Sequence, residues 1–341
     1  MTDATDATAD LKVVSPAPFN AETRLESVSG TVTPAGRHYV RNHFGVPSHD
    51  GVLRVDGSVA RPLEISVDDL RARASVRQTV TLECAGNGRS FLKPPAPGEQ
   101  WALGAVGTAE WTGLPLSDLL AEAEPLPSAV ELLFTGADSG VVGAVGREMS
   151  FQRSLPIGDA GLAFLVVSMN GEPLAANHGA PLRLLVPGRY GMASVKWLSR
   201  ITAIDAPFDG FFQVDRYIVD GQPLGWIAPR AVIASPVDGS SVAIGEEISV
   251  HGFAWSGGGL IERVDVSADG GATWSSASLG PIVGPKAWRE WSMAWRPDRR
   301  GETSLLARAT DATGAVQPLD QVRNDLGYGN NAVRPVTLTI A

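Results

Sequence analysis

The pattern of apolar and polar residues divides the chain into two parts. In the first part, short apolar runs predict strands over three ranges: 130–134, 162–169 and 182–186. Apolar residues spaced three and four apart predict a helix over 115–123, and Ser66 followed by Asp68 and Asp69 predicts a second, short and capped one. Because strands and helices do not alternate regularly, this mixture predicts an α+β domain over residues 19–229.

The part after Pro229 has a different pattern of apolar and polar residues. Seven strand-like runs bounded by turn residues begin near seven positions: Val232, Ile248, Ile261, Thr273, Arg289, Thr303 and Val333. Short strands with turns at this spacing predict an all-β, immunoglobulin-like sandwich over residues 230–341.

Residues 1–18 are small, polar and acidic without periodicity, which predicts a disordered N-terminal tail. This segment lacks the basic and apolar regions of a signal peptide, so we expect a cytoplasmic protein, or a periplasmic one if a leader has been removed. The chain has no apolar run of about 18 residues, so no membrane span is expected. A net charge of −9 argues against nucleic acid as a partner.

Cys84 is the one cysteine in 341 residues, so no disulfide can form within the chain. It is an inert buried thiol, a nucleophile or a thiolate ligand to a metal. It follows a predicted strand over 76–82 and precedes Ala85-Gly86-Asn87-Gly88, a sequence that favours a turn. We therefore expect the thiol to be displayed rather than buried, with Arg89 favouring its thiolate form.

Four other segments place cationic and polar side chains among small residues: 39–47, 135–139, 177–197 and 215–217. Each alone fits a solvated loop or a satisfied core histidine. Together they suit an anion, because backbone N–H groups and cationic side chains cradle phosphate or carboxylate.

In their order along the chain, these segments resemble the hallmarks of the sulfite oxidase family of molybdopterin enzymes, over residues 19–341. The matching motifs are Arg41-Asn42-His43, Cys84-Ala85-Gly86-Asn87, Trp101-Ala102-Leu103-Gly104-Ala105, Thr108-Ala109-Glu110-Trp111-Thr112-Gly113, His178-Gly179-Ala180-Pro181-Leu182-Arg183 and Val195-Lys196-Trp197. Residues 264–274 resemble the dimerisation domain of the family.

The resemblance implies a molybdenum–molybdopterin cofactor with Cys84 as the metal ligand, a soft thiolate beside the soft sulfurs of the pterin. It implies these cofactor-binding residues: Tyr39, Val40, Arg41, Asn42, His43, Cys84, Asp138, His178, Arg183, Ser194, Val195 and Lys196. It implies these catalytic residues: Cys84, Arg41, Arg89, Trp101 and Tyr217.

The implied activity is oxygen-atom transfer on a small oxyanion, most simply sulfite to sulfate. No haem-binding sequence is found, so electrons are expected to pass to a separate acceptor such as a cytochrome. A homodimer is expected through the C-terminal domain, where aromatic residues could form an interface: Trp255, Trp274, Trp288, Trp291 and Trp295. Of these, Trp274 is expected to fill the sandwich.

Leu326 and Gly88 stand where the family carries arginines, which implies a less cationic pocket. Three alternatives stay open: the same cofactor acting on nitrate or an S-oxide, a non-catalytic binding protein with an immunoglobulin-like module, and a Cys84–His hydrolase. Metal content separates the first from the other two.

Overall fold

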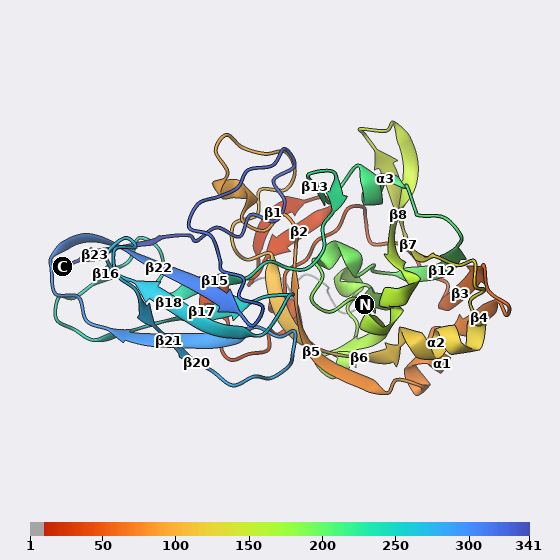
Figure 1. Cartoon of the computed structure of the whole chain (residues 1–341), viewed down its shortest axis with the longest axis horizontal. Coiled ribbons are helices and arrows are strands. Elements are labelled where there is room, and N and C mark those ends of the chain that lie inside the picture. The colour runs from red at the N-terminus through yellow and green to blue at the C-terminus, as the bar shows by residue number, and fades with distance from the viewer. Residues whose placement is uncertain (1–9) are drawn as a thin grey trace.

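The computed structural model describes residues 10–341 (Figure 1), so the first nine residues of the predicted tail lie outside the described residues. The prediction of disorder is wrong for residues 12–16. They form β1 (Lys12–Pro16), which pairs with β2 (Phe19–Glu22) in an antiparallel hairpin. The reason is a small apolar cluster in which Leu11 packs with Ala21 and Val40, a long-range contact that local composition does not reveal.

Two five-stranded sheets form the framework of the first part. One has the order β10-β9-β6-β5, with β11 also paired to β9, and the other has the order β4-β3-β12-β7-β8. The strands of the first are β5 (Val76–Glu83), β6 (Val106–Pro115), β9 (Phe164–Met169), β10 (Glu172–Pro173) and β11 (Arg183–Leu185). The strands of the second are β3 (Val52–Gly57), β4 (Leu63–Ser66), β7 (Glu131–Val142), β8 (Arg147–Pro156) and β12 (Leu198–Ile204). The predicted strands over 130–134, 162–169 and 182–186 are confirmed as β7, β9 and β11.

Both predicted helices are present, although the domain is mostly β with few and short helices. α1 (Val67–Ala72) begins after Ser66, whose Oγ accepts a hydrogen bond from Asp69 N at 3.0 Å, as expected of an N-cap. α2 (Leu116–Ala123) buries its apolar face, and α3 (Phe211–Val214) is one turn. The remaining short elements are the hairpin β13 (Ile218–Val219) with β14 (Gln222–Pro223) and the 3-10 turns Leu25–Ser27, Ala35–Arg37, Arg89–Phe91, Ile157–Leu162, Ala176–His178 and Gly191–Ala193.

The part after residue 229 is all β, and all seven predicted runs contribute strands. One sheet has the order β15-β17-β21-β20, from β15 (Arg230–Ser235), β17 (Ile248–Trp255), β20 (Ser278–Leu279) and β21 (Arg289–Trp295). The other has the order β16-β23-β22-β18-β19, from β16 (Ser241–Val242), β18 (Ile261–Ser267), β19 (Ser275–Ser276), β22 (Gly301–Asp311) and β23 (Val336–Ile340). One apolar core takes residues from both sheets, including Val250 and Leu338.

The two parts share a buried core where they meet, at the centre of Figure 1. Trp255 and Trp288 from the second part are 1% and 0% exposed, and they belong to the same apolar cluster as the sheets of the first. Trp291 is buried inside the second part, whereas Trp274 and Trp295 are half-buried. Three of the five tryptophans proposed for a subunit interface are therefore used within the chain itself.

No helix within residues 10–341 is long and apolar enough to cross a membrane.

Candidate active site

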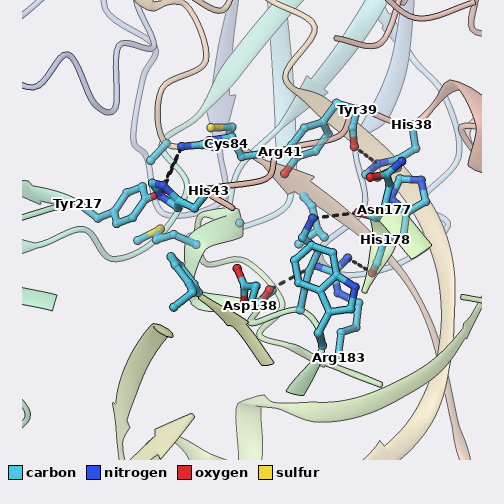
Figure 2. Close-up of a pocket in the computed structure, with 18 residues that line it drawn as sticks. His38, Tyr39, Arg41, His43, Cys84, Asp138, Asn177, His178, Arg183 and Tyr217 are labelled. Atoms are coloured by element: carbon cyan, nitrogen blue, oxygen red, sulfur yellow. Dashed lines mark hydrogen bonds between the residues drawn. The ribbon is translucent and has the colours of Figure 1, made fainter. Parts of the chain in front are cut away.

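A pocket in the first part gathers residues that lie far apart in the sequence (Figure 2). The sequence-predicted residues that line it are Tyr39, Arg41, His43, Cys84, Asp138, His178, Arg183, Ser194, Lys196 and Tyr217. In Figure 2, Cys84, Arg41, His43 and Tyr217 lie on one side of the pocket, and His38 and His178 lie on the other. Four of the six motifs identified by resemblance, those that contain Arg41, Cys84, His178 and Lys196, therefore meet at one place.

Five predicted site residues do not line this pocket: Val40, Asn42, Arg89, Trp101 and Val195. All five are buried. Val40 exchanges two backbone hydrogen bonds with Ala21 of β2, which fixes the segment that carries Tyr39 and Arg41. Asn42 contacts two lining residues through its side chain. Its Oδ1 accepts from Lys196 Nζ, and its Nδ2 donates to Asn177 Oδ1 at 3.0 Å.

Sequence reasoning missed several lining residues: His38, Leu82, Ala85, Phe151, Asn177, Gly191, Met192 and Trp197. Most of them are direct neighbours of motifs that it did identify. The exception is Phe151 on β8, which reaches the pocket because β8 pairs with β7. The pairing of those two strands was not predicted.

Cys84 lies at the first position after β5, where its backbone N–H donates to Ala105 O at 2.8 Å. The turn that follows is tight: Asn87 N donates to Cys84 O at 2.9 Å, and Gly88 has a φ of 84°. The expectation of a displayed thiol is wrong, since Cys84 is only 7% exposed, although it does line the pocket. Burial raises the pKa of the thiol and outweighs the opposing effects, of which that of Arg41 is the largest, so the cationic surroundings alone do not make it a thiolate.

The far side of the pocket is organised around Arg183 on β11. Its guanidinium donates to His178 O at 3.0 Å and to Ser194 O at 3.3 Å, and it lies 5.0 Å from the ring centroid of Trp111. His178 Nε2 donates to Ala35 O at 3.0 Å, which leaves Nδ1 as an acceptor. These contacts hold two cationic or polar side chains from separate loops at fixed positions.

Most of the charged side chains that line the pocket are basic. Arg41, Arg183 and Lys196 line it, and among residues 10–341 none of them forms an ion pair. The one acidic lining residue is Asp138, whose pKa burial raises, against the effect of Lys196, to about 6. Burial also lowers the pKa of Lys196 well below its usual value. Because buried charges are normally paired, this arrangement fits a site that receives an anion.

Three buried polar atoms at the far side have no hydrogen-bond partner within the described residues: Arg183 Nε, Asp138 Oδ1 and His38 Nε2. Donors and acceptors together suit a ligand that carries both kinds of group, as a pterin ring with a phosphate does. Cys84 offers a sulfur ligand at the other side. The residues present therefore fit a molybdenum–molybdopterin cofactor, with Cys84 toward the metal and Arg183, Lys196 and His178 toward the pterin and phosphate.

At the Cys84 side, Arg41, His43 and Tyr217 form a hydrogen-bonded group. Arg41 Nη2 lies 3.2 Å from His43 Nδ1, and His43 Nε2 is hydrogen-bonded to the hydroxyl of Tyr217. Burial and the charge of Arg41 lower the pKa of His43 well below its usual value, so the imidazole stays neutral, with one ring nitrogen as a donor and the other as an acceptor. Tyr217 is held in position with a φ of 56°, in the left-handed region that few tyrosines adopt.

Neither Leu326 nor Gly88 lines the pocket, and the expectation that their replacement of arginines makes it less cationic stays a prediction. Gly88 faces the second part of the chain, where a Cβ would lie 3.0 Å from Asn330 O. Leu326 offers its backbone carbonyl to Arg89 Nε at 3.2 Å. The cations of the pocket come from Arg41, Arg183 and Lys196 instead.

His38, which the sequence analysis did not select, carries a testable consequence for stability. It is 2% exposed, and burial lowers its pKa from 6.5 to about 4. A depressed histidine pKa contributes stability that is complete above pH 6.5 and is lost as the pH falls toward 4, because only the unfolded chain takes up the proton. At about 1.4 kcal/mol per pKa unit, the loss totals about 3 kcal/mol.

We therefore expect the unfolding free energy of His38→Gln to fall less between pH 7 and pH 4 than that of the wild type. The difference in unfolding free energy between the two proteins, measured by urea titration without cofactor, should change by about 3 kcal/mol between pH 7 and pH 4. His251→Gln is the matched control, since His251 lies on the exposed face of β17. Parallel profiles for wild type and His38→Gln would contradict the prediction.

Comparisons with known proteins agree with this geometry. An oxidoreductase molybdopterin binding domain matches residues 43–212, and a Mo-co oxidoreductase dimerisation domain matches residues 227–340. The mitochondrial sulfite oxidase of Mus musculus is 36% identical over 90% of this chain, which spans 61% of that protein. The sulfite oxidase of Arabidopsis thaliana is 32% identical over 97% of this chain and 94% of that protein.

A solved structure is also similar over nearly the whole chain. The sulfane dehydrogenase SoxCD from Paracoccus pantotrophus has 31% sequence identity and a TM-score of 0.82, and the match covers 98% of this chain and 92% of that one. Both family domains are therefore present in one continuous chain, and the first part holds a pocket that fits the cofactor. The chain belongs to the sulfite oxidase family of molybdopterin oxidoreductases.

Proposed function

We propose that the protein is a molybdenum-dependent oxidoreductase that oxidises sulfite to sulfate and passes electrons to a separate acceptor. The observation that carries the proposal is the pocket itself, with one thiol on one side and unpaired cations on the other. When bound, the cofactor supplies the oxygen-atom transfer and the two-electron redox step. The balanced reaction takes sulfite and water to sulfate, two protons and two electrons.

The roles of the chain's own residues follow from their contacts. Arg41 supplies a cationic donor beside Cys84, which suits a sulfur oxyanion. His43, which is neutral, is hydrogen-bonded to Tyr217 and so fixes the hydroxyl at the Cys84 side of the pocket. Arg183 and Lys196 would hold the anionic end of the cofactor.

The test is purification from a host that makes the cofactor, followed by metal analysis and steady-state assays with an artificial electron acceptor. We expect about one molybdenum per chain and turnover of sulfite, with nitrate and S-oxides far poorer. Oxidation of sulfane sulfur is the second candidate, because the SoxCD structure is similar over nearly its whole length. Molybdenum without sulfite turnover would favour one of these other substrates, and protein without molybdenum would favour a binding protein.

We also propose that the C-terminal domain is an immunoglobulin-like sandwich that joins two copies of the chain. Its strand orders β15-β17-β21-β20 and β16-β23-β22-β18-β19, and its match to a dimerisation domain, support this. Light scattering at micromolar concentration should give twice the chain mass of 35.8 kDa. A mass equal to that of one chain would disprove the dimer.

A further inference from the structure

Behind Tyr217, away from the pocket lining, two guanidinium groups and two phenol rings form a row. The Cζ atom of Arg153 lies 5.8 Å from the ring centroid of Tyr217. The rings of Tyr217 and Tyr328 are stacked, with centroids 5.1 Å apart and planes 28° apart. The Cζ atom of Arg89 lies 4.9 Å from the ring centroid of Tyr328. We call these four side chains the arginine–tyrosine row.

The members of the row come from four separate segments. Arg153 is on β8, Tyr217 follows α3, Arg89 is in the turn after Cys84, and Tyr328 lies between β22 and β23 in the C-terminal domain. Of the four, Tyr217 alone lines the pocket. Through the stacking of Tyr328 on Tyr217, the C-terminal domain contacts the hydrogen-bonded group of Arg41, His43 and Tyr217.

Neither arginine has a carboxylate partner within residues 10–341. Arg153 is 4% exposed; it donates Nη1 to Phe212 O, and its Nε has no partner among the described residues. Arg89 is 5% exposed and donates to the backbone carbonyls of Leu326 and Glu99. An unpaired buried cation is costly, so its presence indicates that an anion lies within its electrostatic reach when the protein is at work.

The geometry of β8 directs the charge of Arg153 toward the pocket. Side chains two residues apart lie on the same face of a strand, and Phe151, two residues before Arg153, lines the pocket. Arg153 is thus on the pocket side of β8, separated from the cavity by the ring of Tyr217. In a buried site, the charge of Arg153 attracts an anion in the pocket strongly across the ring of Tyr217.

We propose that Arg153 is a positioning and specificity residue of this site: it holds the ring of Tyr217 and makes the Cys84 side of the pocket selective for an anionic substrate. The proposal deepens the proposed function and rests on it for the identity of the anion. Arg89 and Tyr328 complete the row from the opposite end. A neutral substrate would gain nothing from this charge, so the row favours a sulfur oxyanion.

The test compares Arg153→Met with Arg153→Lys in the cofactor-loaded enzyme. We expect Arg153→Met to raise the KM for sulfite and the Kd for sulfate about tenfold, with kcat changed by less than about threefold, since the charge acts on bound substrate and transition state alike. Arg153→Lys should restore most of the affinity. Arg308→Met is the matched control, because Arg308 lies 4.5 Å from the ring centroid of Trp274 in the C-terminal domain and should leave both constants unchanged.

Unchanged affinity in Arg153→Met, or an equal loss in Arg308→Met, would overturn the proposal. If Arg153→Met does not fold, Tyr328→Leu replaces it: breaking the stack should raise the sulfate Kd, whereas Tyr328→Phe should not. Sulfate binding also separates the two proposals. If the wild type binds sulfate but does not oxidise sulfite, the proposed function is wrong and the role proposed for Arg153 stands. If the wild type binds no sulfate, the role proposed for Arg153 is wrong.

Discussion

Replacing Cys84 with serine is expected to abolish turnover while the protein keeps its fold and its pterin. The serine hydroxyl is a hard and weakly acidic ligand, unlike the soft thiolate that suits a metal already bound to sulfur. Substitutions around metal ligands typically cost 10- to 100-fold in activity, so loss of the ligand itself should cost more than about 100-fold. Steady-state assays with sulfite, together with molybdenum and pterin analysis of the same sample, measure both sides of the prediction.

The stability of the Cys84→Ser protein should be close to that of the wild type. The two side chains are similar in size, and the turn is held by backbone contacts such as Cys84 N to Ala105 O at 2.8 Å, which the substitution keeps. Ser90→Ala is a suitable control, because Ser90 lies in the turn after Cys84 and outside the pocket lining. Activity of Cys84→Ser within a few-fold of wild type would show that the thiol is not the ligand.

Local patterns predicted the elements of this fold well. Ser66 caps α1, the spacing over 115–123 forms α2, and the seven runs after Pro229 all become strands. These features depend on contacts between neighbours in the sequence, which periodicity and turn residues record. The same patterns do not record how strands pair, so they predict disorder for β1, although β1 pairs with β2 and β2 in turn bonds to Val40 through Ala21.

The site was predicted through its motifs, and its deviations have a physical cause. Backbone contacts hold Val40 and Val195 against other segments, where the backbone rather than the side chain serves the site. Arg89 lies outside the pocket lining, where its guanidinium donates to the carbonyls of Leu326 and Glu99 and lies over the ring of Tyr328. Such choices depend on tertiary partners from the C-terminal domain, which no local motif specifies.

Arg153 is a second case in which tertiary contacts, and not a local motif, identify a residue of the site. It stands in a run of β-sheet residues with no motif around it, and its interest lies in what the fold places beside it. Burial without a carboxylate partner becomes visible only once β8, α3 and the segment after α3 are packed together. Functional charge of this kind has no signature in a single sequence.

The junction between the two parts depends on a buried ion pair. Of the single substitutions proposed, one that breaks this pair should lower the unfolding free energy most. Arg230 and Glu83 are 2% and 1% exposed at the side chain, with Nε and Oε1 3.0 Å apart. Glu83 also accepts from Asn87 Nδ2 and from Trp255 Nε1, each at 2.9 Å. Arg230→Met leaves this carboxylate buried and unpaired, which should cost about 3–5 kcal/mol of unfolding free energy.

Urea unfolding of four proteins tests the prediction. Arg230→Met should lose about 3–5 kcal/mol, whereas the double variant Arg230→Met with Glu83→Gln should regain most of it, because no buried charge remains and the amide still accepts from Trp255. Arg61→Met is the control: its pair with Glu124 is 58% and 55% exposed, so its loss should cost less than about 1 kcal/mol. Since Glu83 directly precedes Cys84, Arg230→Met should also retain less cofactor than the double variant does. Equal stability of Arg230→Met and Arg61→Met would show that the pair does not hold the junction.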